Sequence, residues 1–120
     1  MIVRIWRTGV DRNRLEEYAR FEEERSLPMF RERSGFLGVL FLREGEDRAA
    51  ALTLWEDMAA LEALATSSSY LRTVQELVDT GLLIGGQSVD ILHVHGGRSR
   101  GRPRRLERVH VPRAWRPASL

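Results

Sequence analysis

Residues 52–61 read LTLWEDMAAL. An alternating apolar run ends at Trp55, two acids follow, and a pattern of small and apolar residues begins at Met58. This order predicts a strand that ends at Trp55, a helix N-cap at Asp57, and a helix from Met58 to about Ala65. A tryptophan at a strand–helix corner either fills core volume or forms the wall of a pocket, and this choice bears directly on function.

The same periodicities outline the rest of the chain. Strands are predicted over residues 2–8, 36–42, 49–55 and 88–95. Helices are predicted over residues 14–25, 58–65 and 70–79. The second and third strands form a hairpin, with Gly45 in the turn between them. The order β-α-β-β-α-β predicts an α+β, ferredoxin-like sandwich with an antiparallel four-stranded sheet.

The sequence also predicts where a helix is interrupted, where a loop lies and which residues of one helix face inward. Pro28 interrupts the first helical pattern, so that Ser26 caps a second short helix, which Gly35 ends. Gly85 and Gly86 are expected in a loop before the last strand. The apolar residues expected to face inward from the helix at 70–79 are Leu71, Val74, Leu77 and Val78.

Three of the predicted strands are apolar on both faces. In the first strand, Ile2 and Trp6 alternate with Val3 and Ile5. Helices cover one face of such a sheet, and the chain has no further elements to cover the other face. A homodimer that packs two sheets against each other is therefore expected.

Composition sets the broad class of the protein. With 120 residues and 42% hydrophobic residues, the chain suits one compact domain. It contains no cysteine, which excludes disulfides, thiolate metal sites and thiol nucleophiles. No apolar run approaches the roughly 20 residues of a membrane span, and the N-terminus does not resemble a signal peptide. A cytoplasmic protein without a membrane partner is expected.

Charge divides the chain into two parts. Residues 98–120 contain eight arginines and one acid, whereas residues 1–97 contain eleven arginines and sixteen acids. Residues 1–97 are expected to form the domain, and residues 98–120 an Arg-rich extension that is flexible and dispensable for the fold. Binding of the basic tail to nucleic acid is the alternative. It is disfavoured because the tail has only one aromatic residue and the preceding domain is acidic.

With this order of elements, the chain resembles the antibiotic biosynthesis monooxygenase (ABM) family of the dimeric α+β barrel superfamily. The resemblance covers residues 1 to about 95 and rests on three stretches: MIVRIWRTG, SGFLGVLFLRE and LTLWEDMAALEAL. The stretch LTLWEDMAALEAL matches a pattern that is common in the family, in which a strand ends in Trp and an acidic residue before a short helix. The resemblance implies a homodimer with a pocket between helices and sheet in each subunit. It also implies enzymes that use neither metal nor flavin to help a phenolic substrate lose its proton and react with oxygen.

The haem-degrading branch of this superfamily is disfavoured. By their spacing, the positions of that branch's Asn, Trp and His correspond to Arg7, Leu64 and Val74. None of the three residue types is present at its place.

The candidate site consists of four residues: Arg7, Trp55, Tyr70 and His93. Trp55 and Tyr70 are expected to shape a substrate pocket, although packing alone would also explain each of them. Arg4 and Arg7 lie on opposite faces of the first strand, so one should reach the helix-side pocket. Arg7 is expected to hold an anionic oxygen there, with an ion pair to a first-helix glutamate as the alternative.

His93 is the candidate general base, because an imidazole titrates near neutral pH. The alternative is a solvent-exposed histidine at a strand end. His93 and His95 have metal-ligand spacing but no third ligand nearby in the sequence, so no metal site is expected.

Together these features predict a small monooxygenase that acts on an aromatic or oxidisable small molecule without cofactor. The alternative is a non-catalytic small-ligand-binding or stress-associated dimeric α+β barrel protein. A proton acceptor in the same cavity as Trp55 would favour catalysis, and a purely apolar lining would favour binding alone.

Overall fold

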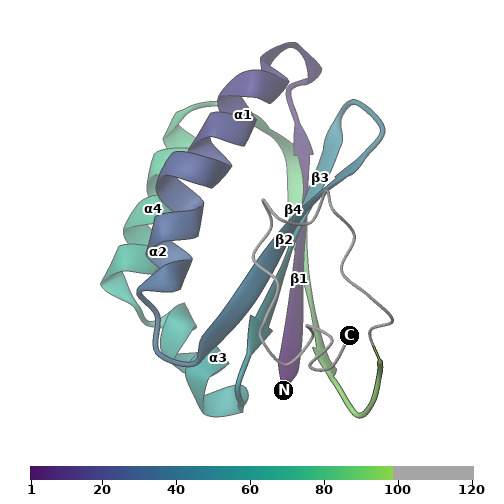
Figure 1. The fold of residues 1–120 in the computed structure, drawn as a ribbon. Helices are drawn as coiled ribbons and strands as arrows, with labels where there is room; N and C mark the ends of the chain where they lie inside the picture. The colour runs from purple at the N-terminus through teal and green to yellow at the C-terminus, as the bar shows by residue number, and fades with distance from the viewer. Residues whose placement is uncertain (99–120) are drawn as a thin grey trace.

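The computed structural model describes residues 1–98, which form one sheet with helices on one side (Figure 1). The strands are β1 (Ile2–Val10), β2 (Phe36–Glu44), β3 (Arg48–Trp55) and β4 (Leu83–His93). The helices are η1 (Arg12–Arg14), α1 (Leu15–Phe21), η2 (Glu22–Ser26), α2 (Leu27–Arg31), α3 (Met58–Ala65) and α4 (Ser68–Asp79). The predicted Arg-rich extension lies almost entirely outside the described residues.

The four strands form one antiparallel sheet in the order β2-β3-β1-β4. This confirms the predicted α+β, ferredoxin-like fold and the β2–β3 hairpin. In the register between the central strands, Ile2 lies opposite Trp55 and Arg4 opposite Thr53. These four residues therefore point to the same face of the sheet, because side chains alternate along a strand.

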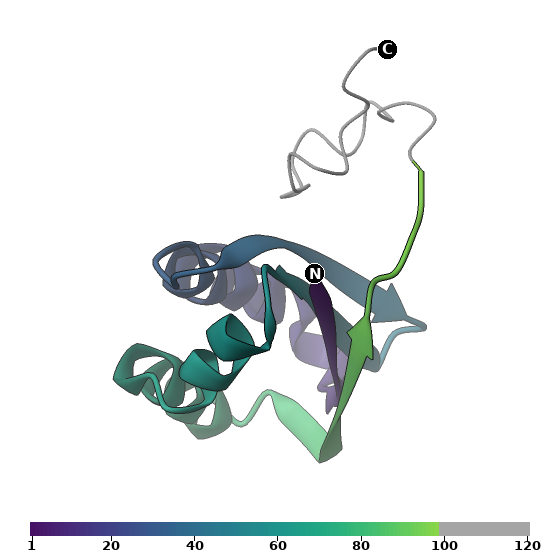
Figure 2. The same cartoon turned by 90° about the horizontal axis from the view of Figure 1, so that it is seen from below.

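All the helices pack on that one face, which Figure 2 shows from below. Two apolar clusters fill the space between helices and sheet. One surrounds Trp55 and includes Phe30 and Leu64, and the other surrounds Tyr18 and includes Leu77. The opposite face of the sheet carries no helix within the described part of the chain.

The first helical region differs from prediction at Pro28. Instead of an interruption capped by Ser26, a π-helical turn over Glu22–Ser26 joins α1 to α2. Ser26 itself has helical dihedral angles and makes no side-chain cap hydrogen bond. The Leu27 N–H reaches back five residues to the Glu22 carbonyl. Since Pro28 has no N–H to offer to the preceding turn, the wider turn lets the helical path continue through it.

The inward face of α4 also differs from prediction. Leu77 is buried as expected, but Leu71 and Val78 are about half exposed, at 53% and 50%, and Val74 is exposed as well. Thr73 takes the buried position instead and satisfies its hydroxyl on the Ser69 carbonyl at 2.9 Å. The apolar residues of α4 therefore lie partly on its rim and do not all face the sheet.

The last strand begins earlier than predicted. β4 starts at Leu83, so Gly85 and Gly86 lie inside it, and it ends at His93. The register with β1 shifts between Arg7 and Gly9, which marks a bulge beside these glycines. Glycine-rich sequence predicts a loop locally, but here pairing with β1 extends the strand through it.

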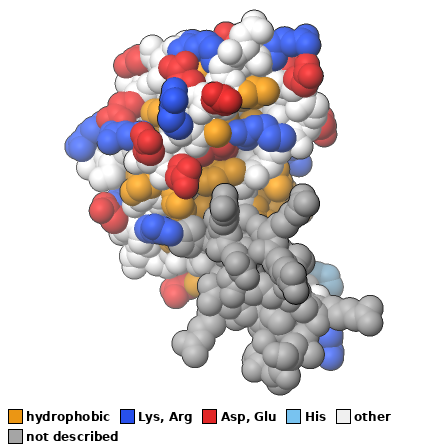
Figure 3. All heavy atoms as spheres, turned by 45° about the horizontal axis from the view of Figure 1, so that its top comes forward, with side chains coloured by type: hydrophobic (Ala, Val, Ile, Leu, Met, Phe, Trp, Pro, Cys, Tyr) orange, Lys and Arg blue, Asp and Glu red, His pale blue; other side chains and the backbone are white. Residues whose placement is uncertain are grey.

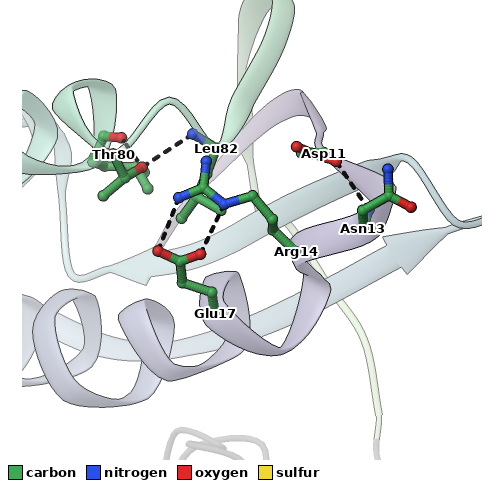
Figure 4. Close-up of polar contacts among 7 residues, drawn as sticks. Asp11, Asn13, Arg14, Glu17, Thr80 and Leu82 are labelled. Carbon is green, nitrogen blue, oxygen red and sulfur yellow. Dashed lines mark hydrogen bonds and ion pairs between the residues drawn. The ribbon is translucent and has the colours of Figure 1, made fainter.

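The β1–α1 and α4–β4 connections meet at one end of the sandwich, shown in Figure 4. Asp11 caps the first turn by accepting from the Asn13 N–H at 2.9 Å. The Asp11 N–H donates to the Leu82 carbonyl at 2.9 Å, which ties the two connections together. Thr80 accepts from the Leu82 N–H at 3.1 Å and so shapes the exit from α4.

The strand–helix corner after β3 is built as the sequence predicts. Asp57 caps α3 by accepting from the Ala60 N–H at 2.8 Å, which confirms the predicted N-cap. The sequence predicted that Gly35 ends the preceding helix, but α2 already ends at Arg31, and Gly35 lies in the turn after it with φ of 78°, a conformation that favours glycine. The Gly35 carbonyl accepts from the Glu56 N–H at 2.9 Å, and this hydrogen bond joins the turn before β2 to the corner after β3.

The surface of the described residues mixes charges of both signs. Figure 3 shows, on one side of the molecule, hydrophobic side chains gathered between arginines and acids. The exposed large hydrophobic residues are Leu42, Leu71, Val74, Val78, Ile84, Val89, Ile91 and Leu92. Among residues 1–98, no helix is long and apolar enough to cross a membrane.

Candidate functional site

A cavity of about 100 Å³ lies between the helices and the sheet. It opens beside α4, and the exposed side chains of Val74 and Val78 line it. We call it the helix–sheet cavity. Its lining residues are Arg4, Trp6, Tyr18, Glu22, Ser26, Met29, Phe30, Phe41, Ala51, Tyr70, Thr73, Val74, Leu77, Val78, Leu83 and Gln87. Aromatic and aliphatic groups dominate, with a few polar groups among them, as is typical of small-molecule sites.

Arg4 and Tyr70 form one polar group in this lining. The Arg4 guanidinium donates from Nη2 to the Tyr70 hydroxyl oxygen at 2.8 Å and lies 5.6 Å from the centre of the tyrosine ring. No carboxylate within residues 1–98 forms an ion pair with Arg4. Because the guanidinium carries five N–H donors, most of them are not used by Tyr70 and can meet a ligand.

Glu22 and Arg43 form a second polar group. Arg43 donates from Nη2 to Glu22 Oε1 at 2.6 Å and from Nη1 to Oε2 at 3.3 Å. The Glu22 residue is only 6% exposed. Burial raises the pKa of the Glu22 carboxyl above its ordinary value, and the hydrogen bonds from Arg43 oppose that shift.

Tyr18 completes this second group. The Arg43 guanidinium lies 4.9 Å from the centre of the Tyr18 ring, which places the cation over an aromatic face. Burial raises the pKa of the Tyr18 hydroxyl, and the neighbouring Glu22 charge adds to the shift. Tyr18 therefore stays a neutral phenol over the ordinary pH range, and Glu22 is the group here that can exchange a proton.

Tyr70 lies where the sequence interpretation expected a pocket residue, and Trp55 does not. Trp55 is fully buried, at 0% exposure, and does not line the helix–sheet cavity. Its indole N–H donates to Thr53 Oγ1 at 2.8 Å, and its ring makes edge contacts with Phe30 and Phe36. The expectation that Trp55 is partly exposed to the cavity is wrong, because these rings enclose it.

Arg7 also lies elsewhere. It faces the side of the sheet without helices and forms an ion pair with Asp90 of β4. The expectation that Arg7 and Trp55 reach one cavity is wrong, because Arg7 lies five positions from Ile2, the residue opposite Trp55. An odd spacing along a strand puts side chains on opposite faces. The more general expectation, that one of the two strand arginines reaches the helix-side pocket, is confirmed for Arg4.

His93 lies at the end of β4 with an exposed side chain and does not line the helix–sheet cavity. The structure therefore does not bring it together with Arg4 and Tyr70. Within residues 1–98, no three His, Asp or Glu side chains are grouped so that they could hold a metal ion.

Sequence interpretation missed Glu22, Trp6 and Phe41 as lining residues. Glu22 stands four residues after Tyr18 and seven after Leu15, on the apolar stripe of the first helix. A carboxylate on such a stripe is unusual and could have marked it. Its partner Arg43 comes from β2, and no local pattern connects the two.

Comparison with solved structures finds many proteins of the same fold. An antibiotic biosynthesis monooxygenase matches 80% of this chain and 100% of its own, with TM-score 0.64 and 14% identity. SnoaB, a cofactor-independent oxygenase from Streptomyces nogalater, matches 80% of this chain and 94% of its own, with TM-score 0.61 and 18% identity. A monooxygenase from ActVA-Orf6 of Streptomyces coelicolor, solved with nanaomycin D, matches 80% and 88%, with TM-score 0.66 and 15% identity.

The chain has the fold of the antibiotic biosynthesis monooxygenases. This confirms, at the level of the fold, the resemblance found in the three sequence stretches. No protein-family model matches the chain, and no curated protein matches it in sequence. Activity and substrate therefore have to be argued from the chain's own residues.

Proposed function

We propose that this protein is a small oxidoreductase of the monooxygenase type that binds an aromatic or otherwise oxidisable molecule in the helix–sheet cavity. The observation that carries the proposal is the Arg4–Tyr70 pair, joined at 2.8 Å inside an otherwise largely apolar lining. Arg4 has no carboxylate partner within residues 1–98, and such a guanidinium favours an anionic ligand, because a charge-assisted hydrogen bond would offset its partial desolvation. A phenolate oxygen fits this place.

The chemistry follows from holding the substrate as an anion. Loss of a proton makes an electron-rich aromatic ring a better reductant for dioxygen. In a balanced monooxygenation without an external reductant, the substrate loses two hydrogens and gains one oxygen atom, and the second oxygen leaves as water. Arg4 stabilises the anion, and the Tyr70 hydroxyl can donate to the same oxygen.

The size of the cavity limits the substrate. A cavity of about 150 Å³ holds benzene, whereas drug-sized ligands occupy about 300–1,000 Å³. The volume of about 100 Å³ here is smaller than a benzene-sized cavity, so even a single-ring substrate would reach into the opening. A larger substrate would extend through the opening beside Val74 and Val78.

Following the family resemblance, the proposal assigns no metal or flavin to the reaction. It includes a homodimer formed by the sheet faces that carry no helix. In each copy these faces present apolar side chains from the central strands, among them Ile5 and its neighbour Leu52. A cytoplasmic location stays a prediction.

A dimeric protein that binds a small ligand without chemistry is the second candidate. It was expected to have a cavity lined only by apolar groups. The lining here includes Arg4, Tyr70 and the carboxylate of Glu22, which favours catalysis. The exposed position of His93 removes one base from the cavity but leaves that carboxylate.

Binding of 4-nitrophenolate to Arg4→Met and Arg7→Met variants tests the proposal. We expect Arg4→Met to weaken binding tenfold or more, since a charge-assisted hydrogen bond contributes about 1.5–3 kcal/mol. Arg7→Met is the matched control: it removes an arginine from the same strand, on the opposite face, and should leave binding unchanged.

Oxygen uptake separates the two candidates. A panel of monocyclic and bicyclic phenols is compared with and without protein on an oxygen electrode. Uptake that depends on the protein and is lost in Arg4→Met supports the monooxygenase. Binding that depends on Arg4 without any uptake favours the non-catalytic candidate, and binding that depends on Arg7 instead contradicts the proposed site.

A further inference from the structure

The helix–sheet cavity contains a buried carboxylate that plays no part in anion binding by Arg4. Glu22 lines the same cavity as Arg4 and Tyr70 and is 6% exposed. A carboxylate is rarely placed in an apolar helix–sheet interface unless it is paired or serves a reaction.

The ion pair with Arg43 leaves Glu22 able to accept a proton. An ionised carboxylate has about four lone-pair sites, and Arg43 occupies one on each oxygen. The contact to Oε1 is short, at 2.6 Å, whereas the contact to Oε2 is 3.3 Å. Oε2 is therefore the more weakly held oxygen and the better place for an incoming proton.

Arg43 is itself held in place. It lies over the Tyr18 ring at 4.9 Å, and its Nη1 also donates to the Leu42 carbonyl at 3.3 Å. Among residues 1–98, the charged and titratable groups that interact with Glu22 are Arg43 from β2 and Tyr18 from α1, and Arg4 and Tyr70 line the same cavity. The hydrogen bonds from Arg43 oppose the effect of burial and favour the ionised carboxylate of Glu22, and Tyr18 remains neutral.

The backbone around Glu22 is also unusual. Glu22 and Ser26, the first and last residues of the π-helical turn, both line the cavity. Single π-helical turns inside α-helices occur frequently at functional sites. Here the turn coincides with the one carboxylate that residues 1–98 contribute to the cavity lining.

We propose that Glu22 is the proton acceptor of the helix–sheet cavity. This inference rests on the proposed function, because it takes the ligand of the cavity to be a phenol. As the phenol binds, its O–H bond breaks, the electron pair stays on the phenolate oxygen near Arg4, and the proton passes to Glu22 Oε2. Burial raises the pKa of Glu22 and so helps the carboxyl retain that proton.

Proton counting during binding of 4-nitrophenol tests this assignment. The full-length protein is titrated below the solution pKa of the probe, while visible absorption reports bound phenolate. Calorimetry in two buffers with different ionisation enthalpies reports protons released to solvent. In the wild type we expect bound phenolate and close to no proton release, because Glu22 takes up the proton.

Glu22→Gln keeps the side-chain volume and an oxygen that can accept from Arg43, but it cannot take up the proton. In this variant we expect the probe to stay neutral, or about one proton to reach the buffer for each phenolate bound. Glu23→Gln is the matched control, since Glu23 is the exposed neighbour on the same turn and does not line the cavity. It should behave as the wild type.

Three results would overturn the assignment. One is a wild-type protein that releases one proton for each phenolate bound, which can be measured even if Glu22→Gln does not fold. Another is a folded Glu22→Gln variant that binds phenolate without proton release. Both leave ligand binding by Arg4 intact, whereas a wild type that does not bind the probe overturns the proposed cavity function together with this assignment.

Discussion

The indole N–H of Trp55 donates to Thr53 Oγ1 at 2.8 Å, from one residue to the next on the same face of β3. Both residues are fully buried, at 0% exposure. The bond satisfies the only polar atom of the indole inside the apolar cluster around it. The tryptophan at the strand–helix corner is therefore a core residue, and the pocket lies further along the sheet.

Trp55→Phe should therefore lower stability and leave ligand binding unchanged. The smaller ring leaves space beside Phe30 and Phe36, and Thr53 loses its donor. We expect a loss of roughly 1–3 kcal/mol in the free energy of unfolding. Urea denaturation measures the loss, and titration with 4-nitrophenolate checks binding. Weaker binding with unchanged stability would contradict this and indicate that Trp55 lines the pocket.

Gly35→Ala should destabilise the fold more than Gly45→Ala. Both glycines have positive φ, 78° and 64°, so each substitution is expected to cost about 1–2 kcal/mol in backbone strain. At Gly35 a Cβ would also lie 2.4 Å from the Ala60 Cβ, whereas nothing lies within 4 Å at Gly45. This overpacking should add about 1–3 kcal/mol. Equal thermal shifts for the two variants would contradict the close packing at this corner.

The stability difference between the wild type and Glu22→Gln should depend on pH. The pKa of Glu22 is raised in the folded state above its ordinary 4.5, so the folded protein holds this proton more tightly than the unfolded chain. The stabilisation is complete below the ordinary pKa and is lost as pH rises through the folded value. The wild type should therefore lose stability relative to Glu22→Gln across this window. Urea unfolding at several pH values measures this change. A wild type that gains stability relative to Glu22→Gln as pH rises would contradict the raised pKa.

Ile5→Glu should convert the proposed homodimer to monomer. Ile5 lies between Leu52 and Asp90 on the sheet face without helices, where the second copy is proposed to pack. A charge buried there without a partner would oppose association. Leu71→Glu is the control, since Leu71 is 53% exposed on α4, away from that face. Sedimentation measures the mass of each, and a wild type that is monomeric at micromolar concentration would contradict the dimer.

Local sequence patterns determined the order of elements and their boundaries at several corners. Asp57 caps α3 as predicted, because a helix cap depends on residues only a few positions apart. The π-helical turn before Pro28 and the extension of β4 through Gly85 were not predicted. The first depends on how a helix accommodates a missing N–H, and the second on pairing with a distant strand.

The candidate site was decided by the tertiary structure. Two arginines on opposite faces of β1 were visible in the sequence, but only the register with β3 determines that Arg4 shares a face with Trp55. In the same way, Glu22 becomes a buried, paired carboxylate only because β2 brings Arg43 to it across 21 residues of sequence. Sequence periodicity reports which side chains share a face, whereas strand pairing determines which face the helices cover and which distant charges meet there.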